Sequence, residues 1–207
     1  MPRPKFVQVA RSMKYTSLLL IFTLVGCSGA PTVKSWLDRV SSATITAQSE
    51  PLILARDEQR RSINERDFAQ LTAVEVNRMG ERRLYLVAVP WSSTHQTRVE
   101  HENFESSFAR IELRMGDRST TLTRHEGDIA KLGFGQSPVP LPIPGSPQLF
   151  FPIERAELSA LASSNRVQLI ALGQPEEPHS YDEWQDGRRS LLTFLDQLPT
   201  EAKNSGQ

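Results

Sequence analysis

The stretch "LTAVEVNRMGERRLYLVAV" (residues 71–89) decides the fold, because it contains two β-rich runs on either side of a turn. Gly80 in the turn can adopt the positive φ that a tight reversal between strands requires. The two runs are therefore predicted to form a β-hairpin. The second run, "LYLVAV" (84–89), is apolar on both faces of a strand and should lie centrally in a sheet.

A second hairpin is predicted from "FARIELRMGDRSTTLT" (108–123). Its first strand alternates apolar with charged residues, as a half-buried strand does: Ala109, Ile111 and Leu113 against Arg110, Glu112 and Arg114. The two turns carry nearly the same pentapeptide, RMGER (78–82) and RMGDR (114–118). Two arginine-rich tips could grip an anionic ligand, but two unrelated hairpins that share common turn chemistry explain the likeness more simply.

Further runs complete the predicted sheet. Strands are predicted over "PLILA" (51–55), "QLFFPI" (148–153) and "RVQLIAL" (166–172), and a helix over "ERAELSALASS" (154–164). The proline-rich run "SPVPLPIPGSP" (137–147) should be extended and lie outside any central strand. It is interpreted as a stiff connector that packs on the core, or alternatively as a recognition segment for an aromatic groove.

Helices are predicted at both ends of the folded part. "VKSWLDRV" (33–40) has apolar residues at helical spacing, with Thr32 as a candidate N-cap. This helix would either dock on the domain or lie on a membrane. A C-terminal helix is predicted from Ser180, which has capping-box spacing to Glu183. Four residues would share one face of that helix: Trp184, Leu191, Leu195 and Leu198. The predicted fold is therefore α+β, with a mostly antiparallel sheet built from two hairpins, a strand–helix–strand unit and a C-terminal helix.

The N-terminal segment has the layout of a secretory signal. Four basic residues precede a short apolar run, "LLLIFTLV" (18–25): Arg3, Lys5, Arg11 and Lys14. The run is too short for a transmembrane helix, which needs about 20 apolar residues. A basic segment followed by a short apolar core is typical of an export signal that is later removed.

The end of this segment, Leu24-Val25-Gly26-Cys27, resembles the lipobox of bacterial lipoproteins. The resemblance covers the leader only. It implies cleavage between Gly26 and Cys27, attachment of diacylglycerol to the Cys27 sulfur, and acylation of the new N-terminus. A leader that starts at Met13 would already be complete, so Met1 and Met13 are both candidate starts. Ser28 after the cysteine implies the outer membrane, since aspartate at that position favours inner-membrane retention in similar lipoproteins.

The predicted organisation follows from this cleavage. Residues 1–26 are the signal peptide, 27–50 the lipidated cysteine with a tether and short helix, 51–199 one α+β domain, and 200–207 a disordered tail. Lipid on Cys27, the only cysteine, leaves no thiol for a disulfide or a nucleophile. Residues 27–207 hold 20 basic and 24 acidic residues. This mildly acidic balance argues against a nucleic-acid partner, which a clustered basic face would indicate.

No catalytic or metal-binding motif is visible. The four histidines are His95, His101, His125 and His179. "HENFE" (101–105) and "HEGDI" (125–129) begin like the zinc motif H-E-x-x-H but lack the second histidine. There is no G-x-S-x-G elbow and no phosphate-binding glycine loop. A cluster of acids near the predicted C-terminal helix fits a helix start: Glu176, Glu177, Asp182, Glu183 and Asp186. No catalytic residue, metal or cofactor is therefore predicted.

The sequence thus predicts a lipid-anchored cell-envelope protein with a small domain facing the periplasm, held on the membrane by its N-terminal lipid. The domain is interpreted as a non-enzymatic accessory or binding factor, with an envelope protein as a possible partner. The alternative is an envelope hydrolase, acting on peptidoglycan or an ester, with a dispersed active site. A carrier of an apolar ligand is a third hypothesis, and it would require a sizeable enclosed apolar cavity.

Overall fold

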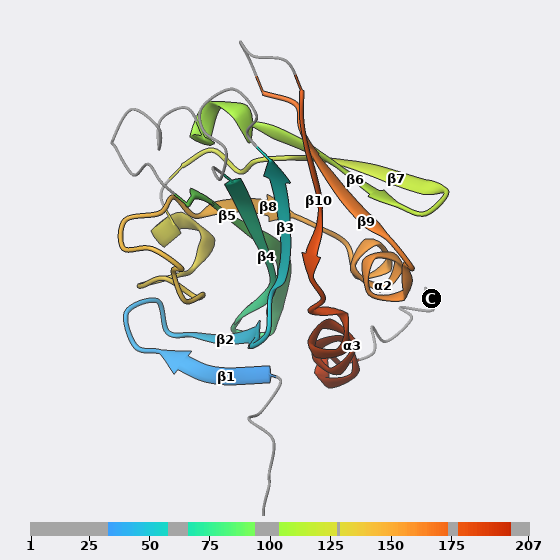
Figure 1. The fold of residues 1–207 in the computed structure, drawn as a ribbon. Helices are drawn as coiled ribbons and strands as arrows, with labels where there is room; N and C mark the ends of the chain where they lie inside the picture. The colour runs from blue at the N-terminus through green and yellow to red at the C-terminus, as the bar shows by residue number, and fades with distance from the viewer. Residues whose placement is uncertain (1–32, 58–65, 94–103, 128, 174–177, 200–207) are drawn as a thin grey trace, which may run out of the picture. The chain divides into compact units, whose positions relative to one another are not determined.

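Strands make up 49% and helices 19% of the described residues, so the chain folds as a mainly β protein. The computed structural model describes residues 33–57, 66–93, 104–127, 129–173 and 178–199. Their strands form one antiparallel sheet that curls into a half-barrel (Figure 1). The predicted α+β class is wrong, because residues 33–38 and 179–185, which have helical apolar spacing, are strands of this sheet.

The elements follow one another in the order in which they are numbered in Figure 1. The strands are β1 (Val33–Asp38), β2 (Ala43–Gln48), β3 (Leu52–Asp57), β4 (Arg66–Arg78), β5 (Glu81–Ser92), β6 (Arg110–Met115), β7 (Arg118–Thr123), β8 (Leu149–Pro152), β9 (Val167–Ala171) and β10 (His179–Gln185). The helices are a short turn over residues 104–107, the 3₁₀ helix η1 (Ile129–Leu132), α2 (Arg155–Ser163) and α3 (Arg188–Gln197).

Strand β4 is the centre of the sheet. One of its edges pairs with β5 from Asp67↔Ser92 to Arg78↔Glu81, which confirms the first predicted hairpin. The other edge is shared by two strands, because β3 pairs with the first half of β4 and β2 with the second half. From β3 the sheet continues through β10, β9 and β6 to β7, whereas β8 pairs with β5. The second hairpin, β6–β7, is confirmed as well.

Gln48 closes the gap that this sharing leaves. The backbone amide of Ala73 lies between the two paired segments, and it donates a hydrogen bond to Gln48 Oε1 over 3.1 Å. Gln48 Nε2 donates to the carbonyls of Glu50 (2.6 Å) and Gly187 (3.0 Å). The side chain is buried. One amide group therefore replaces a missing strand partner and ties the β2–β3 junction to the start of α3.

The helix predicted over 33–40 is wrong. Residues 33–38 are β1, which pairs with β2 from Val33↔Gln48 to Asp38↔Ala43. In this strand Trp36 packs against buried residues of the sheet. Leu37 points to the opposite face and is 63% exposed, and Val40 in the following turn is 81% exposed. The apolar spacing that resembled a helix arises from a strand and its turn, and the sheet begins at Val33 rather than after residue 50.

The helix predicted from Ser180 begins too early. Residues 179–185 are β10, which pairs with β9 and β3, and α3 starts only after Gly187. A side chain at Gly187 would collide with the backbone of Pro51, so this close approach fixes where the helix can begin. Leu191, Leu195 and Leu198 are buried as predicted, but Trp184 lies on β10 and is 59% exposed.

The remaining three predicted strands and the predicted helix over 154–164 are confirmed. The predicted strands appear as β3, β8 and β9, and the predicted helix as α2. The proline-rich run lies outside the sheet. Its Val139 is buried, and the carbonyl of Pro140 accepts a hydrogen bond from Gln70 Nε2 over 3.2 Å. This packing agrees with the connector interpretation.

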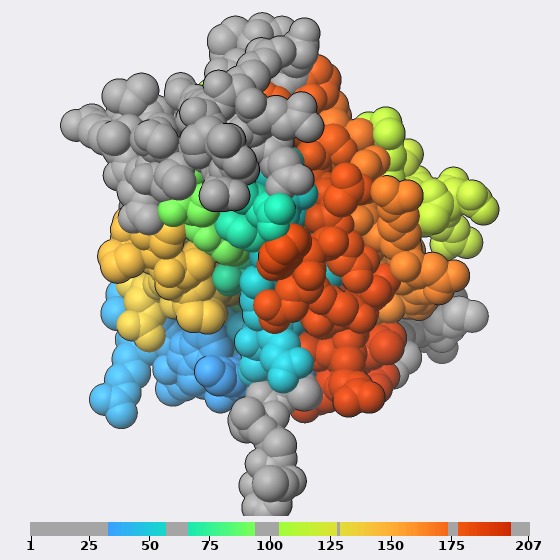
Figure 2. Space-filling view, viewed as in Figure 1, coloured from blue at the N-terminus to red at the C-terminus, as the bar shows by residue number. Residues whose placement is uncertain are grey.

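Both faces of the central strands are covered. The inner face, with α2 and α3, forms the larger core, whose largest fully buried aromatic residues are Phe108, Phe151, Phe194 and Tyr181. The outer face of β2, β4, β5 and β8 is covered by residues 129–148, where Phe134 contacts Tyr85 and Phe150. Figure 2 shows this covering segment, in yellow to gold, lying against the blue β1–β2 hairpin. β5 therefore lies centrally, as its apolar sequence predicts.

The two similar turns place their methionines in opposite environments. In β4–β5 the last pair is Arg78↔Glu81, so Met79 and Gly80 form the turn, both with positive φ (54° and 90°). In β6–β7 the last pair is Met115↔Arg118, and Gly116 begins the turn. A shift of one residue relative to the turn moves a side chain to another face. Met115 is consequently 7% exposed, whereas Met79 is 100% exposed.

Replacing Gln48 by leucine should destabilise the fold by about 1–3 kcal/mol, because the buried Ala73 amide loses its partner. The Gly187 carbonyl keeps its bond from the Leu191 amide. Urea unfolding followed by circular dichroism measures the loss of stability. Gln168→Leu is the matched control, because Gln168 Nε2 makes an exposed hydrogen bond to Asp182 and its loss should cost far less. Equal losses of stability in the two variants would contradict the role assigned to Gln48.

Candidate functional site

A pocket of about 480 Å³ lies where the β4–β5 hairpin meets the N-terminus of α2 and the C-terminal end of α3. It combines charged and apolar side chains: Glu75, Arg82, Leu84, Ile153, Glu154, Arg155, Ala156, Leu198 and Pro199. A neighbouring pocket of about 440 Å³ shares Leu84, Ile153 and Glu154 with it. Concave surfaces at which polar and apolar side chains converge are candidate ligand sites.

The strand pairing places Glu75 in the wall of this pocket. Every second residue of β4 before Glu75 belongs to the inner core: Ala69, Leu71 and Ala73. The partners of Glu75 across the sheet are Thr46 on β2 and Leu84 on β5. Side chains at alternate positions of a strand share a face. Glu75 is therefore the residue at which the inner face of β4 changes from apolar core to pocket.

The carboxylate of Glu75 is incompletely compensated. The residue is only 7% exposed. The nearest guanidinium is that of Arg82, whose Nη1 lies 3.7 Å from Glu75 Oε1, an ion pair too long for a hydrogen bond. Burial raises the pKa of Glu75 above its ordinary value, and the charges of Arg82 and Arg155 oppose this rise in part. A charged group held in the interior at a cost in stability is a candidate functional group.

Arg155 builds one wall of the pocket. Its guanidinium donates hydrogen bonds to three carbonyls at the end of α3, those of Leu195 (2.7 Å), Leu198 (3.2 Å) and Pro199 (3.2 Å). These bonds satisfy carbonyls that a helix end leaves without partners. Arg155 thereby joins α3 to the start of α2 and holds both beside Glu75.

The lining of the two pockets decides which chemistry they can support. It includes glutamates, arginines and a tyrosine but no serine, threonine, cysteine, lysine or histidine. Acyl transfer needs an activated nucleophile with a base nearby, which this lining does not supply. It is instead suited to bind a group that donates hydrogen bonds to Glu75 while its apolar part contacts Leu84, Ile153 and Leu198.

Most residues singled out from sequence do not meet at this pocket. Gly26, Cys27, His95, His101, Glu176 and Glu177 lie outside the described residues. His125 donates its backbone amide to the Phe150 carbonyl over 2.7 Å and lines neither pocket. His179 begins β10, opposite Ala171. Within the described ranges no three potential metal ligands come together.

The remaining acids of the predicted cluster form ion pairs. Asp182 accepts hydrogen bonds from Arg166 (3.0 Å) and Gln168 (3.1 Å). Glu183 and Asp186 both accept from Arg188, over 2.7 and 2.8 Å, and this arginine lowers the pKa of Asp186. These acids are accounted for as partners of arginines. They lie on β10 and before α3, not at a helix start at residue 180.

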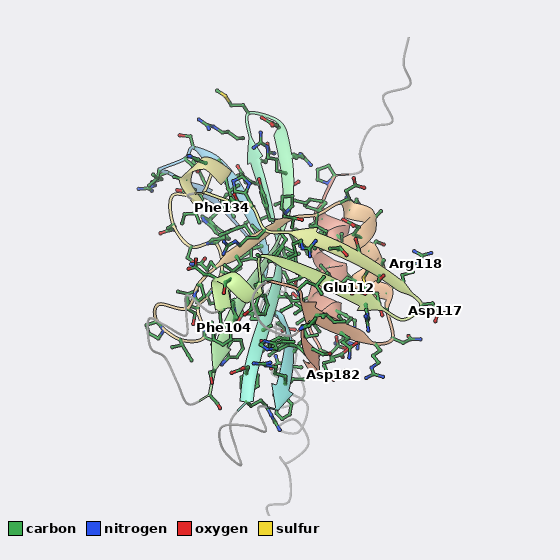
Figure 3. The ribbon with its side chains drawn as sticks, turned by 90° about the horizontal axis from the view of Figure 1, so that it is seen from above. Phe104, Glu112, Asp117, Arg118, Phe134 and Asp182 are labelled. Atoms are coloured by element: carbon green, nitrogen blue, oxygen red, sulfur yellow. The ribbon has the colours of Figure 1, made fainter. Side chains whose placement is uncertain are left out.

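The structure does not bring the two arginine-rich tips together. Asp117 and Arg118 lie at the far end of the β6–β7 hairpin, which extends in a different direction from the β4–β5 hairpin (Figure 3). At these hairpins Arg83 pairs with Glu81, and Arg114 with Glu112. A joint anion grip by the two turns is therefore not supported.

A partly exposed aromatic cluster lies on the outer face at the other end of β4. Phe68 stacks on Trp91 at 5.0 Å between ring centroids and meets the edge of Trp184 at 6.2 Å. The guanidinium of Arg66 lies 4.3 Å from the centroid of the Trp184 ring. These contacts explain how Trp184 is held on the surface.

Sequence reasoning missed Glu75. The available signal was an acid inside a continuous apolar run, at the same strand phase as Ala69, Leu71 and Ala73. The signal was hard to use because β4 is apolar on both faces, so its alternation does not show which face is inward. Arg82 and Arg155 reach Glu75 from other elements, and only the fold brings them there.

No protein-family model matches the chain, and neither a curated protein nor a solved structure is significantly similar to it. The helices among the described residues include none that is long and apolar enough to span a membrane. The geometry of the site therefore carries the functional argument.

Replacing Glu75 by glutamine should stabilise the protein at neutral pH. Because burial raises the pKa of Glu75 in the folded state, the wild type loses stability as pH rises from the ordinary value of 4.5 through the raised value. The variant lacks this loss, so its advantage in melting temperature should be absent below pH 4.5 and grow above it. Asp117→Asn, at an exposed tip, is the control; a stability difference for Glu75→Gln that does not change with pH would contradict the assignment.

Proposed function

We propose that the protein is a lipid-anchored binding factor of the cell envelope, attached through Cys27 to the outer membrane and facing the periplasm. The lipobox resemblance supports the anchor. The Glu75 pocket supports a binding role, with a ligand that carries a cationic hydrogen-bond donor next to an apolar group. A basic residue beside an aliphatic one in an envelope protein partner has this chemistry.

One observation carries the binding role. The Glu75 carboxylate opens into a pocket, is 7% exposed, and finds no hydrogen-bond donor among the described residues. A charged ligand donor would supply the missing partner, and such charge-assisted bonds are stronger than neutral ones. Arg82 is 41% exposed in its side chain, so it can turn toward solvent when a ligand enters.

The alternative, a hydrolase of the glycan strands of peptidoglycan, uses the same pocket. It rests on the presence of two carboxylates, Glu75 and Glu154, and on the raised pKa that a general acid needs. The two functions make opposite predictions with purified peptidoglycan. If the wild type releases reducing sugar and both Glu75→Gln and Glu154→Gln fail to do so, the pocket is catalytic and the binding role is wrong.

The anchor is tested by replacing Cys27 with serine in the native host. We expect loss of palmitate labelling and release from the membrane fraction, because no acyl chain would remain. Ser28→Ala is the control and should stay lipidated, whereas Ser28→Asp should keep the label and move to the inner membrane. A Cys27→Ser protein that remains fully membrane-bound would overturn the lipid anchor.

The pocket is tested with two probes of equal length, hexylammonium and hexanoate. Hexylammonium should shift the methyl NMR signals of Leu84 and Ile153, and Glu75→Gln should weaken its binding by about tenfold or more. Hexanoate should bind weakly to both proteins. Asp117→Asn is again the control. Equal binding of hexylammonium to wild type and Glu75→Gln would show that Glu75 is not the recognition group.

A further inference from the structure

Two turns with exposed apolar side chains lie at the same end of the sheet. Strand β2 pairs with β4 up to Thr44↔Asn77, so the β1–β2 turn (residues 39–42) and the β4–β5 turn (residues 79–80) both reverse just beyond this pair. Leu37, Val40 and Met79 are 63%, 81% and 100% exposed there. With Arg39 and Arg78 they form what we call the double-tip surface.

The backbone at Met79 makes its exposure noteworthy. Met79 adopts a φ of 54°, in the left-handed region where glycine and asparagine are favoured. A methionine here is unfavourable for the backbone and contributes nothing to the core. Exposed apolar side chains at strained turns are expected where they make a contact outside the domain.

The charge of the double-tip surface indicates which kind of partner it can bind. Arg39 and Arg78 are exposed and have no acidic partner within the described part of the chain, whereas Arg83 is paired with Glu81. The nearby Asp38 is buried and accepts hydrogen bonds from the backbone amides of Val40 (2.9 Å) and Gly135. The surface is therefore basic and apolar on a mildly acidic body. Arginines beside exposed apolar side chains are the composition that inserts into an anionic lipid interface.

We propose that the double-tip surface inserts into the headgroup region of the membrane leaflet that holds the Cys27 lipid. This inference rests on the lipid anchor of the proposed function. The chain length permits both contacts: the six steps from Cys27 to Val33 reach at most about 20 Å, and β1 spans about 17 Å from Val33 to its turn. The membrane would then be bound at two places, which fixes the orientation of the domain.

The opposite end of β4 is the competing surface, and its contacts argue against it. The Trp184 ring is in contact with Arg66 and with the edge of Phe68. Its aromatic surface is therefore partly occupied within the domain, whereas Met79 is fully exposed. Insertion would also have to displace the Arg66 contact.

The test uses single cysteines in the mature lipidated protein. Lipid occupies the sulfur of Cys27, the only cysteine, so an introduced thiol is the only reactive one. Val40→Cys and Met79→Cys report on the double-tip surface, Asp117→Cys on the β6–β7 tip, and Trp184→Cys on the opposite end. All four sites are exposed, and circular dichroism checks that each variant folds.

Each variant is bound to vesicles of phosphatidylethanolamine and phosphatidylglycerol in roughly three-to-one proportion, and a charged maleimide is added. We expect labelling of Val40→Cys and Met79→Cys to slow by about tenfold relative to the unbound protein, since insertion excludes water and the reagent. Asp117→Cys and Trp184→Cys should label at unchanged rates. Adding Arg39→Gln and Arg78→Gln should restore tip labelling, whereas Arg114→Gln and Arg118→Gln should not.

Three outcomes would overturn the proposal. Equal labelling at all four sites would mean that no part of the domain near them enters the membrane. Protection of Trp184→Cys alone would assign the contact to the opposite end. Tip protection that disappears when the protein is diluted over more vesicles would indicate contact with a second copy. A failure of the anchor is separately visible, because Cys27 of the wild type would then itself take up the maleimide.

Discussion

The structure depends on the way one edge of β4 is divided between β2 and β3. The division lets β1 and β2 extend the sheet in one direction while β3 carries it on to β10 and the rest of the half-barrel. It also leaves the Ala73 amide without a strand partner, and the Gln48 side chain supplies that partner from the interior. Because Gln48 also bonds to the Gly187 carbonyl, the same residue ties the start of α3 to the sheet.

The division of β4 has a consequence for the site. Both faces of β4 are buried, and neighbouring strands pair with both of its edges except at Thr72 and Ala73, up to the point where the inner core ends. Glu75 lies at that point, between Thr46 and Leu84, and α2 and α3 close the pocket around it through Arg155. A desolvated carboxylate can persist there because the surrounding core, not the carboxylate, stabilises the fold.

The local sequence pattern was sufficient where tertiary contacts do not change the secondary structure that a segment prefers. The two hairpins, strands β3, β8 and β9, and helix α2 could be predicted from turn glycines and apolar periodicity. The pattern failed at residues 33–40 and 180–185, where short segments with helical spacing are strands: β1 pairs with the neighbouring β2, and β10 pairs with β9 and with the distant β3. Strand pairing of this kind is decided by partners that local spacing does not reveal. The two similar turns, RMGER (78–82) and RMGDR (114–118), also could not be distinguished from local sequence. Met115 is buried and Met79 is exposed because the strand register differs by one residue.

By itself, the sequence determined the features that are local in the chain: the hairpin turns, the proline-rich connector, and a single cysteine in a segment that resembles a lipoprotein signal. Covalent neighbours suffice for these features. The tertiary structure alone decided that the domain is mainly β, that Glu75, Arg82 and Arg155 share a pocket, and that two exposed turns lie side by side. These features depend on contacts between residues that are far apart in sequence, such as Glu75 and Arg155. Such contacts form only when the whole sheet and its helices assemble.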